Sequence, residues 1–299
     1  MRLYTCKDKG GRQFVAAASD ERPELLVDLA VLDYRFGSMQ ELIDAAASDS
    51  GLLSSISADV KETKEAVMLT KNEVEICAPI PHPRQDLICL GINYMAHAEE
   101  SARYKNEAFG GERPYAVYFS KRVGEAVPDG GCIPAYEGFV DSLDYEVELA
   151  VIIGRTAKDV EEKDALEHIL GYTVINDVSA RNIQTRHKQW YFGKSFDGFT
   201  PMGPCIVTAD EFSFPPELAI RSYVNGELRQ DSSTSLLIFG IAHVIAELSK
   251  GMTLYPGTVI AMGTPAGVGM GFEPPRFLSA GDEIRCEIEG IGTLTNTVK

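Results

Sequence analysis

The sequence predicts an α+β protein in which a small N-terminal α/β domain, residues 1–78, precedes a larger domain, residues 79–299, built on a curled mixed sheet. The chain of 299 residues is long enough for both domains. Pro79, Pro81 and Pro83 hold the backbone extended and mark the junction. Beyond them, long strand-like segments with few helices between them favour a mixed sheet over a doubly wound one.

The N-terminal domain is expected to hold short strands and two helices. Residues 1–7 are typical of a strand that enters a turn at Gly10 and Gly11. Helices are expected at 39–47 and 52–63. No catalytic combination of residues occurs in this region, so we expect the chemistry in the larger domain.

The larger domain is expected to be rich in strands. Apolar and β-branched segments predict strands at 87–90, 116–119, 145–153, 172–176, 218–224, 259–262 and 283–288. The helical pattern predicts helices at 163–170, 179–189 and 235–248. A further helix is expected after the turn at Gly91, with Asn93 as its N-cap.

Composition limits the partners. A net charge of −16 argues against nucleic acid and anionic membranes, because both are recognised through a basic surface. The six cysteines form no CxxC pair, which indicates reduced thiols. No apolar run approaches the ~20 residues needed to span a bilayer, and the N-terminus lacks the apolar core of a signal peptide. We therefore expect a soluble cytoplasmic protein.

The strand at 145–153 carries two carboxylates. Glu146 and Glu148 share one of its faces, while the other face is wholly apolar. Their Cα atoms are expected to lie roughly 6.5 to 7 Å apart, so both carboxylates are able to converge on one ion. Asp177 ends a second apolar run, and three carboxylates suit Mg²⁺ or Mn²⁺ better than Zn²⁺. The alternative is a solvated face on an edge strand, with Asp177 as a helix cap.

Other polar residues surround this acidic cluster in the sequence. His97 and Glu100 are i,i+3 neighbours on the helix after Asn93, where a carboxylate orients an imidazole and raises its basicity. An ordinary surface pair is the alternative. The predicted helix after Asp177 places Arg181 and Gln184 on one face.

Two lysines supply cationic donors in an otherwise acidic chain. Lys121 and Lys194 are flanked by aromatic or glycine residues, although each is also compatible with a plain surface position. The segment Gly193-Lys194-Ser195 is not a P-loop, because Lys188 stands where the upstream glycine is required. It is not a nucleophile elbow either, because Asp197 stands in place of a glycine.

Together these residues resemble the fumarylacetoacetate hydrolase family over roughly residues 80–299. The resemblance rests on motifs in the family order, namely the Gly-x-Asn-Tyr-x-x-His segment 91–97, Phe119-Ser120-Lys121, Asp144-Tyr145-Glu146-Val147-Glu148-Leu149, Asn176-Asp177-Val178-Ser179-Ala180-Arg181, Gly193-Lys194-Ser195-Phe196-Asp197, Val224-Asn225-Gly226-Glu227, and Gly263-Thr264-Pro265-Ala266-Gly267-Val268-Gly269. One departure is Asn182, where the family often has Asp.

The resemblance implies a mixed β-roll catalytic domain and a homodimer. It implies Mg²⁺ or Mn²⁺ held by Glu146, Glu148 and Asp177, and a small 2-oxo acid substrate that chelates the metal. The remaining roles that it implies are catalysis by His97, Glu100 and Lys194, and substrate binding by Lys121, Arg181, Gln184 and Thr264.

The favoured reaction is cleavage of a C–C bond in a 2-oxo or 2,4-dioxo acid, by acylpyruvate-type hydrolysis or oxaloacetate-type decarboxylation. A divalent ion acting as Lewis acid would stabilise the enolate that either cleavage leaves. The alternatives are an isomerase, tautomerase or dehydratase acting on a related acid, and a non-catalytic protein that binds metal and acid. Residues 101–113, with Gly110 and Gly111 as a hinge, are candidates for a lid, or else an ordinary surface loop.

Overall fold

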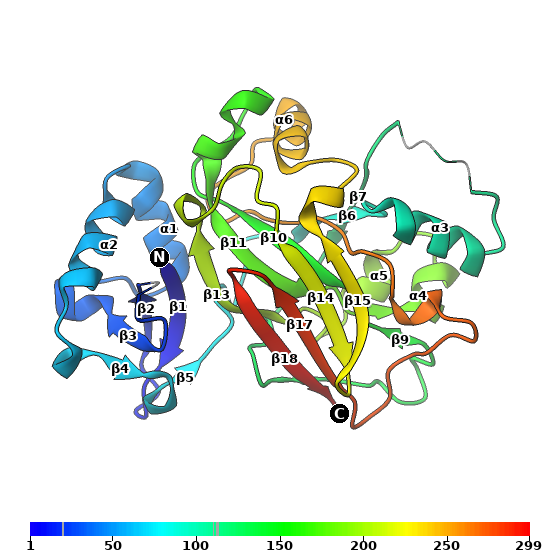
Figure 1. The fold of residues 1–299 in the computed structure, drawn as a ribbon, viewed down its shortest axis with the longest axis horizontal. Helices are drawn as coiled ribbons and strands as arrows, with labels where there is room; N and C mark the ends of the chain where they lie inside the picture. Colours follow the sequence, from blue (N-terminus) through cyan, green and yellow to red (C-terminus); the bar gives the residue numbers. More distant parts are fainter. Residues whose placement is uncertain (20, 110, 112–113) are drawn as a thin grey trace.

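The computed structural model of the protein describes residues 1–19, 21–109, 111 and 114–299. A large mixed sheet runs through the molecule, and a smaller sheet packs beside it (Figure 1). The large sheet has 11 strands: β1 (Arg2–Lys7), β2 (Gln13–Ala18), β3 (Leu25–Asp28), β4 (Leu69–Thr70), β5 (Glu75–Ile76), β6 (Leu87–Gly91), β7 (Val117–Lys121), β10 (Val147–Ile153), β11 (Ile169–Asn176), β13 (Met202–Thr208) and β16 (Val259–Ala261).

Two smaller sheets complete the β-structure. The first has five strands: β8 (Cys132–Ile133), β14 (Ala219–Val224), β15 (Glu227–Ser233), β17 (Glu283–Ile288) and β18 (Gly292–Val298). The second pairs β9 (Leu143–Asp144) with β12 (Ser179–Ala180). Pairing is mostly antiparallel, but β16 with β6 and β18 with β8 are parallel. The α+β expectation is confirmed.

The helices lie around the sheets. They are α1 (Met39–Ser48), α2 (Leu52–Glu62), α3 (Met95–Tyr104), α4 (Arg181–Arg186), α5 (Tyr191–Lys194) and α6 (Ile241–Gly251). Short 3-10 helices are η1 (Leu29–Leu32), η2 (Glu65–Val67), η3 (Lys71–Glu73), η4 (Glu162–His168), η5 (Ala209–Glu211), η6 (Thr234–Leu236) and η7 (Gly269–Gly271). In Figure 1, α1 and α2 lie beside β1 to β3, whereas α3, α4 and α5 gather at the opposite end of the molecule.

The N-terminal region is joined to the larger one through the sheet. Strand β1 pairs antiparallel with β13, with Arg2 opposite Val207 and Leu3 opposite Ile206. Leu42 of α1 belongs to the same buried apolar cluster as Ile206. This pairing makes the N-terminal strands a continuation of the large sheet, while the division of the chain at residue 78 stays a prediction.

Strand β10 is buried on both faces, which corrects one expectation. Val147 and Leu149 pack into one apolar cluster, as expected. The opposite face, which carries Glu148, continues into a second cluster through Ala150 and Ile152. The reason is that β10 lies between β11 and β16 and has core on both sides, so this is not a solvated edge strand.

Several predicted helices are shorter than expected. The segment 163–170 is the 3-10 helix η4 followed by the start of β11 at Ile169, because pairing with β10 extends that strand. Residues 179–180 form a strand before α4, and α6 begins only after Gly240, its N-cap. Asn93 is not the N-cap of α3; Tyr94 occupies that position. Strands β13, β15 and β18 were not predicted.

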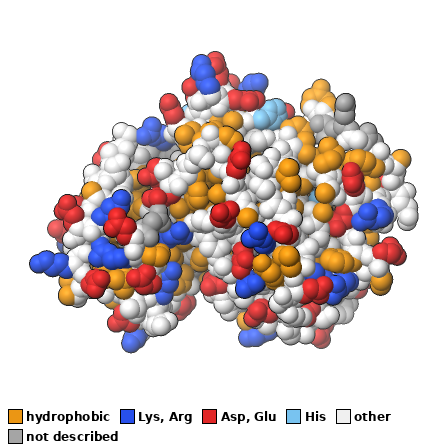
Figure 2. Space-filling view, viewed as in Figure 1, with side chains coloured by type: hydrophobic (Ala, Val, Ile, Leu, Met, Phe, Trp, Pro, Cys, Tyr) orange, Lys and Arg blue, Asp and Glu red, His pale blue; other side chains and the backbone are white. Residues whose placement is uncertain are grey.

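The cysteine thiols and the charged surface side chains can be compared with what the composition predicts. Each of the six cysteines is a free thiol. On the face drawn in Figure 2, acidic and basic side chains are interspersed. Within the described residues, the structure has no helix with the length and apolar character needed to cross a membrane. Of the candidate lid, residues 101–104 belong to α3, and residues 110, 112 and 113 lie outside the described part of the chain.

Candidate active site

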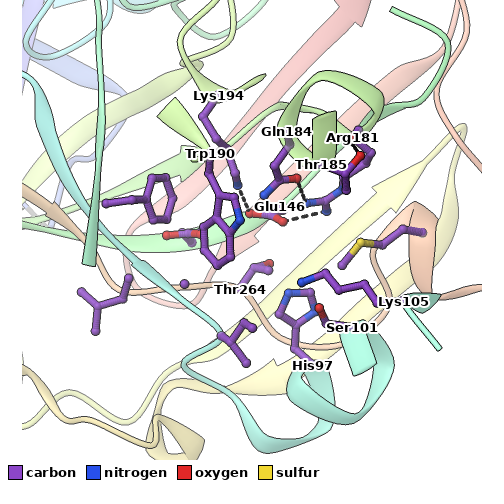
Figure 3. Close-up of a pocket in the computed structure, with 16 residues that line it drawn as sticks. His97, Ser101, Lys105, Glu146, Arg181, Gln184, Thr185, Trp190, Lys194 and Thr264 are labelled. Carbon is purple, nitrogen blue, oxygen red and sulfur yellow. Dashed lines mark hydrogen bonds and ion pairs between the residues drawn. The ribbon is translucent and has the colours of Figure 1, made fainter. Parts of the chain in front are cut away.

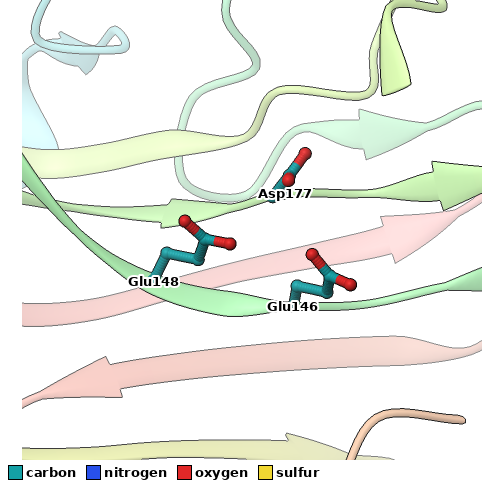
Figure 4. Close-up of side chains that lie close together, drawn as sticks. All are labelled: Glu146, Glu148 and Asp177. Carbon is teal, nitrogen blue, oxygen red and sulfur yellow. The ribbon is translucent and has the colours of Figure 1, made fainter. Parts of the chain in front are cut away.

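Three buried carboxylates converge where β10 begins and β11 ends. Glu146 directly precedes β10, Glu148 lies within it, and Asp177 directly follows β11. One oxygen from each lies within 4.8 Å of the others. The three side chains lie close together (Figure 4). The two strands hold this geometry, since the backbone N–H of Asp177 donates to the carbonyl of Glu146 at 2.9 Å.

Two of these carboxylates are paired with buried cations. Lys194 Nζ lies 2.6 Å from Glu146 Oε2 and 2.6 Å from Asp177 Oδ2. Arg181 Nη2 lies 2.7 Å from Glu146 Oε1, and its Nε donates to Asp144 Oδ2 at 2.8 Å. Burial opposes charge on Lys194, but Asp177 and Glu146 raise the pKa of its ammonium above the ordinary value. The cations therefore fix the orientation of two of the three carboxylates.

Glu148 is the exception. It accepts a hydrogen bond from the Gly263 N–H at 2.8 Å, and no cation pairs with it among the residues that the structure describes. Burial raises the pKa of Glu148 well above its ordinary value, and the nearby carboxylates of Asp177 and Glu146 act in the same direction. The charge of Lys194 opposes this shift only in part, so Glu148 is the least compensated carboxylate of the three.

The donor set fits a hard divalent cation. All three ligands are carboxylate oxygens, which Mg²⁺, Mn²⁺ and Ca²⁺ prefer and which Zn²⁺ favours less than imidazole or thiolate. Among the described residues, the acidic cluster and the buried side chains ion-paired with it or with one another comprise four carboxylates and three cations: Asp144, Glu146, Glu148 and Asp177 with Lys121, Arg181 and Lys194. A dication would reverse the net negative charge of this group and favour an anionic ligand.

His97 and Glu100 form the predicted pair on α3. His97 Nδ1 lies 3.2 Å from Glu100 Oε2, and both side chains are buried. Glu100 also accepts the Gly267 N–H at 3.0 Å. At Gly271 a Cβ atom would lie 1.8 Å from Glu100 Oε1, so only glycine leaves room for this carboxylate. When His97 Nδ1 donates to Glu100, its Nε2 is left as a proton acceptor.

Asn93 does not cap α3, contrary to what the sequence suggested, but supports the start of the helix through its side-chain hydrogen bonds. Its Nδ2 donates to the Met262 carbonyl at 2.8 Å and to the Phe239 carbonyl at 3.1 Å. Its Oδ1 accepts the Phe239 N–H at 2.8 Å. The side chain is therefore fully used in tying the start of α3 to two distant loops.

A cavity of about 40 Å³ lies against these groups (Figure 3). The predicted site residues that line it are His97, Glu146, Glu148, Arg181, Gln184, Lys194 and Thr264. Glu100 lies behind His97, and Asp177 lies behind Lys194, so neither lines it directly.

Lys121 is the predicted site residue that the structure places elsewhere. It is fully buried and does not line the cavity. Its Nζ lies 2.6 Å from Asp177 Oδ1 and donates to the Val178 carbonyl at 3.1 Å. In this position Lys121 supports Asp177 from the side away from the cavity, and its role in substrate binding stays a prediction. Burial lowers the pKa of Lys121 below its usual 10.5, although Asp177 opposes this shift.

Thr264 and Asn182 each form side-chain hydrogen bonds within the protein, although Asn182 Oδ1 has no partner among the described residues. Thr264 Oγ1 donates to the Val147 carbonyl at 2.9 Å and accepts from Gln230 Nε2 at 2.7 Å. Asn182, which departs from the family pattern, donates to the Phe139 carbonyl at 3.1 Å and does not line the cavity. Thr264 therefore shapes the wall, while its hydroxyl holds β10 and the loop before η7 in register.

The residues that line the cavity and were not predicted as site residues include Ser101, Lys105 and Trp190. Ser101 and Lys105 extend from α3, and Trp190 lies just before α5. Lys105 falls inside the segment proposed as a lid, and Trp190 is the single tryptophan of the chain. Either feature could have marked these residues as candidates for the site.

Comparison with known proteins identifies the family. Residues 86–299 match the family model described as Fumarylacetoacetate (FAA) hydrolase C-terminal. The chain belongs to the fumarylacetoacetate hydrolase family. It is 45% identical over 231 residues to oxaloacetate tautomerase YisK of Bacillus subtilis (strain 168), an alignment that covers 77% of this chain and 75% of that protein.

Solved structures of the family confirm the expected fold. A fumarylacetoacetate hydrolase from psychrophilic Exiguobacterium antarcticum matches with a TM-score of 0.79 and 36% identity, over 100% of this chain and 99% of that one. The maleylpyruvate hydrolase of Sphingobium sp. SYK-6 matches with a TM-score of 0.76 and 28% identity, over 100% and 99% of the two chains. The family relatives thus include a tautomerase and hydrolases, which are enzymes.

Proposed function

We propose that this protein holds Mg²⁺ or Mn²⁺ between Glu146, Glu148 and Asp177 and interconverts the keto and enol forms of a small 2-oxo acid, with oxaloacetate as the first candidate. The observation that carries the proposal is that His97 lines the same cavity as Glu146 and Glu148. A proton acceptor and a candidate cation site thereby face one ligand. The similarity to an oxaloacetate tautomerase supports tautomerisation over the C–C bond cleavage that the sequence analysis favoured.

The chemistry divides between the cation and the protein. A bound divalent ion would supply Lewis acidity at the 2-oxo group. His97 Nε2 takes the proton from the carbon next to the 2-oxo group and delivers a proton to the enol oxygen. Glu100 orients the imidazole and stabilises its protonated form. Arg181 and Gln184, which lie beside Glu146 in Figure 3, hold the carboxylate of the acid.

Replacement of the pair tests the assignment of the base. His97→Gln and Glu100→Gln are each expected to lower kcat for tautomerisation by about 10²-fold, the lower part of the range for general acid and base catalysis. The Mn²⁺ affinity should stay within about twofold, because neither side chain belongs to the acidic cluster. Stopped-flow absorbance of the enol and calorimetric Mn²⁺ titration measure the two quantities. Equal losses in both would assign the pair a structural role instead.

Cleavage of a C–C bond is the second candidate. The same His97 and Glu100 pair is positioned to activate a water molecule, and the maleylpyruvate hydrolase shares the fold over the whole chain. Assays of oxaloacetate, acylpyruvates and fumarylpyruvate with Mg²⁺, with Mn²⁺ and with EDTA separate the candidates by product. Tautomerase activity that EDTA leaves unchanged would refute metal dependence. Metal and acid binding with no turnover of any of these acids would favour the non-catalytic alternative.

We also propose that the protein is a homodimer. The large aromatic side chains of Phe139, Tyr191 and Phe192 are 48%, 39% and 45% exposed near α5, and the rings of Phe139 and Phe192 lie 6.5 Å apart. Such an exposed aromatic patch is typical of an association surface. Light scattering on a sizing column is expected to give about twice the chain mass of 32.7 kDa. A mass equal to one chain at micromolar concentration would contradict the dimer.

A further inference from the structure

Lys105 brings a cation to the wall of the cavity from outside the acidic cluster. It is the C-cap of α3, and its aliphatic stem and ammonium line the same space as His97 and Ser101. Figure 3 shows its side chain directed toward the space in front of His97. Lys105 is exposed, so it lies where the cavity meets solvent.

Lys105 makes a cation–π contact but no ion pair within the described part of the chain. The other two cations that line the cavity are paired, Arg181 with Asp144 and Glu146, and Lys194 with Glu146 and Asp177. No carboxylate described in the structure lies within ion-pair distance of Lys105. Its ammonium is therefore available to an anionic group on a ligand.

The surroundings of Lys105 restrict where its ammonium lies. Nζ stands over the Trp190 ring at 5.8 Å from the centroid, a cation–π contact. The Trp190 ring is itself held edge to face against Phe119, with centroids 5.3 Å apart. At Gly91 a Cβ atom would lie 2.1 Å from Trp190 Cζ3, so the absence of a side chain at Gly91 creates the place for the indole. Gly91, Phe119 and Trp190 thus form a packed wall of the cavity, and the ammonium of Lys105 lies against it.

We infer that Lys105, positioned on Trp190, binds a second carboxylate of the substrate, and that the enzyme acts on dicarboxylic rather than monocarboxylic 2-oxo acids. This inference rests on the proposed function, in which Arg181, Gln184 and the cation site hold the 2-oxo acid end. The distal carboxylate then meets the one cavity-lining cation that has no ion-pair partner among the described residues. Lys105 is a specificity-determining residue on this assignment.

The test compares two unreactive 2-hydroxy acids. L-malate and L-lactate share the 2-hydroxycarboxylate group and differ by one distal carboxylate. In the presence of Mn²⁺, Lys105→Met is expected to weaken malate binding about 3- to 10-fold, the size of a partly exposed ion pair, and to leave lactate binding unchanged. Lys105→Arg should restore most of the malate affinity, and KM for oxaloacetate in Lys105→Met should rise by a similar factor.

The matched control is Lys61→Met, which removes the same charge from the exposed face of α2, away from the cavity. Equal losses for malate and lactate in Lys105→Met, or malate affinity equal to that of the Lys61→Met control, would overturn the inference. The two proposals fail separately. If no 2-oxo acid is turned over but malate selectivity depends on Lys105, the proposed function is wrong and the carboxylate site stands. If a 2-oxo acid is turned over but malate selectivity does not depend on Lys105, the proposed function stands and the carboxylate site is wrong.

Discussion

Asp177→Asn is expected to lower the unfolding free energy, measured without metal, by about 3–5 kcal/mol, the usual cost of removing one partner from a buried ion pair. Asp177 binds two buried ammonium groups at once, with Lys121 Nζ and Lys194 Nζ each 2.6 Å from one of its oxygens. All three side chains are excluded from solvent. A neutral amide leaves Lys121 without a carboxylate partner among the described residues, so the variant loses stability and metal binding together.

Asp231→Asn is the matched control for this prediction. Asp231 forms an ion pair with Arg221 at 2.7 Å, but both side chains are well exposed. In urea titrations of both variants, loss of this exposed pair should lower the unfolding free energy far less than Asp177→Asn does. If Asp177→Asn were as stable as this control, the buried network would not contribute to stability.

The pH dependence of the Asp177→Asn variant gives a second check. Burial already holds the pKa of Lys121 below its usual 10.5, and loss of Asp177 removes the group that opposes this shift. The folded variant then binds fewer protons at Lys121 than the unfolded chain does. Its stability is therefore expected to rise with pH in the interval below 10.5. Stability that does not rise over this interval would show that Lys121 keeps its proton in the variant.

Glu148→Gln is expected to separate the two effects, with metal binding weakened and stability kept. Removing one of three charged ligands should weaken Mg²⁺ or Mn²⁺ binding by about 10³-fold, or about 4 kcal/mol. Without metal, the melting temperature should stay the same or rise, because Glu148 has like charges around it and no cationic partner among the described residues. The amide oxygen of glutamine is still able to accept the Gly263 N–H.

Calorimetric Mn²⁺ titration and thermal unfolding with EDTA measure the two effects. Glu289→Gln is the control, because Glu289 also accepts one backbone N–H, from Ala219 at 3.1 Å, but lies exposed and far along the chain from the cluster. Wild-type Mn²⁺ affinity in Glu148→Gln would remove Glu148 from the ligand set. A large loss of stability without metal would show that its charge is compensated by the fold.

The placement of the acidic cluster and of the His97–Glu100 pair was predictable because it depends on local spacing. Glu146 and Glu148 are two residues apart on one strand, and His97 and Glu100 are one helical turn apart, so alternation and helical period bring each pair together. The meeting of Asp177 with Glu146 needed only the pairing of two adjacent apolar strands. Sequence reasoning therefore found the acidic cluster and the imidazole–carboxylate pair.

The remaining features depend on contacts between distant parts of the chain. The residues that flank Lys121 suggested a ligand-binding lysine. Its contact with Asp177, which lies 56 residues further along the chain, shows that it supports the acidic cluster. Strand β13 contains Gly203 and Pro204, which weaken a strand pattern, yet β1 and β11 pair on either side of it. Trp190 belongs to the cavity because Gly91, far away in sequence, leaves room for it.

The pairing of β1 with β13 bears on how the two regions of the chain depend on each other. A fragment that began after the proline-rich junction would leave one edge of β13 unpaired, with the apolar residues Ile206 and Val207 beside it. An uncovered apolar edge is a template for intermolecular strand addition and hence for aggregation. The N-terminal strands, which contribute no residue to the cavity, thus protect the catalytic sheet from self-association.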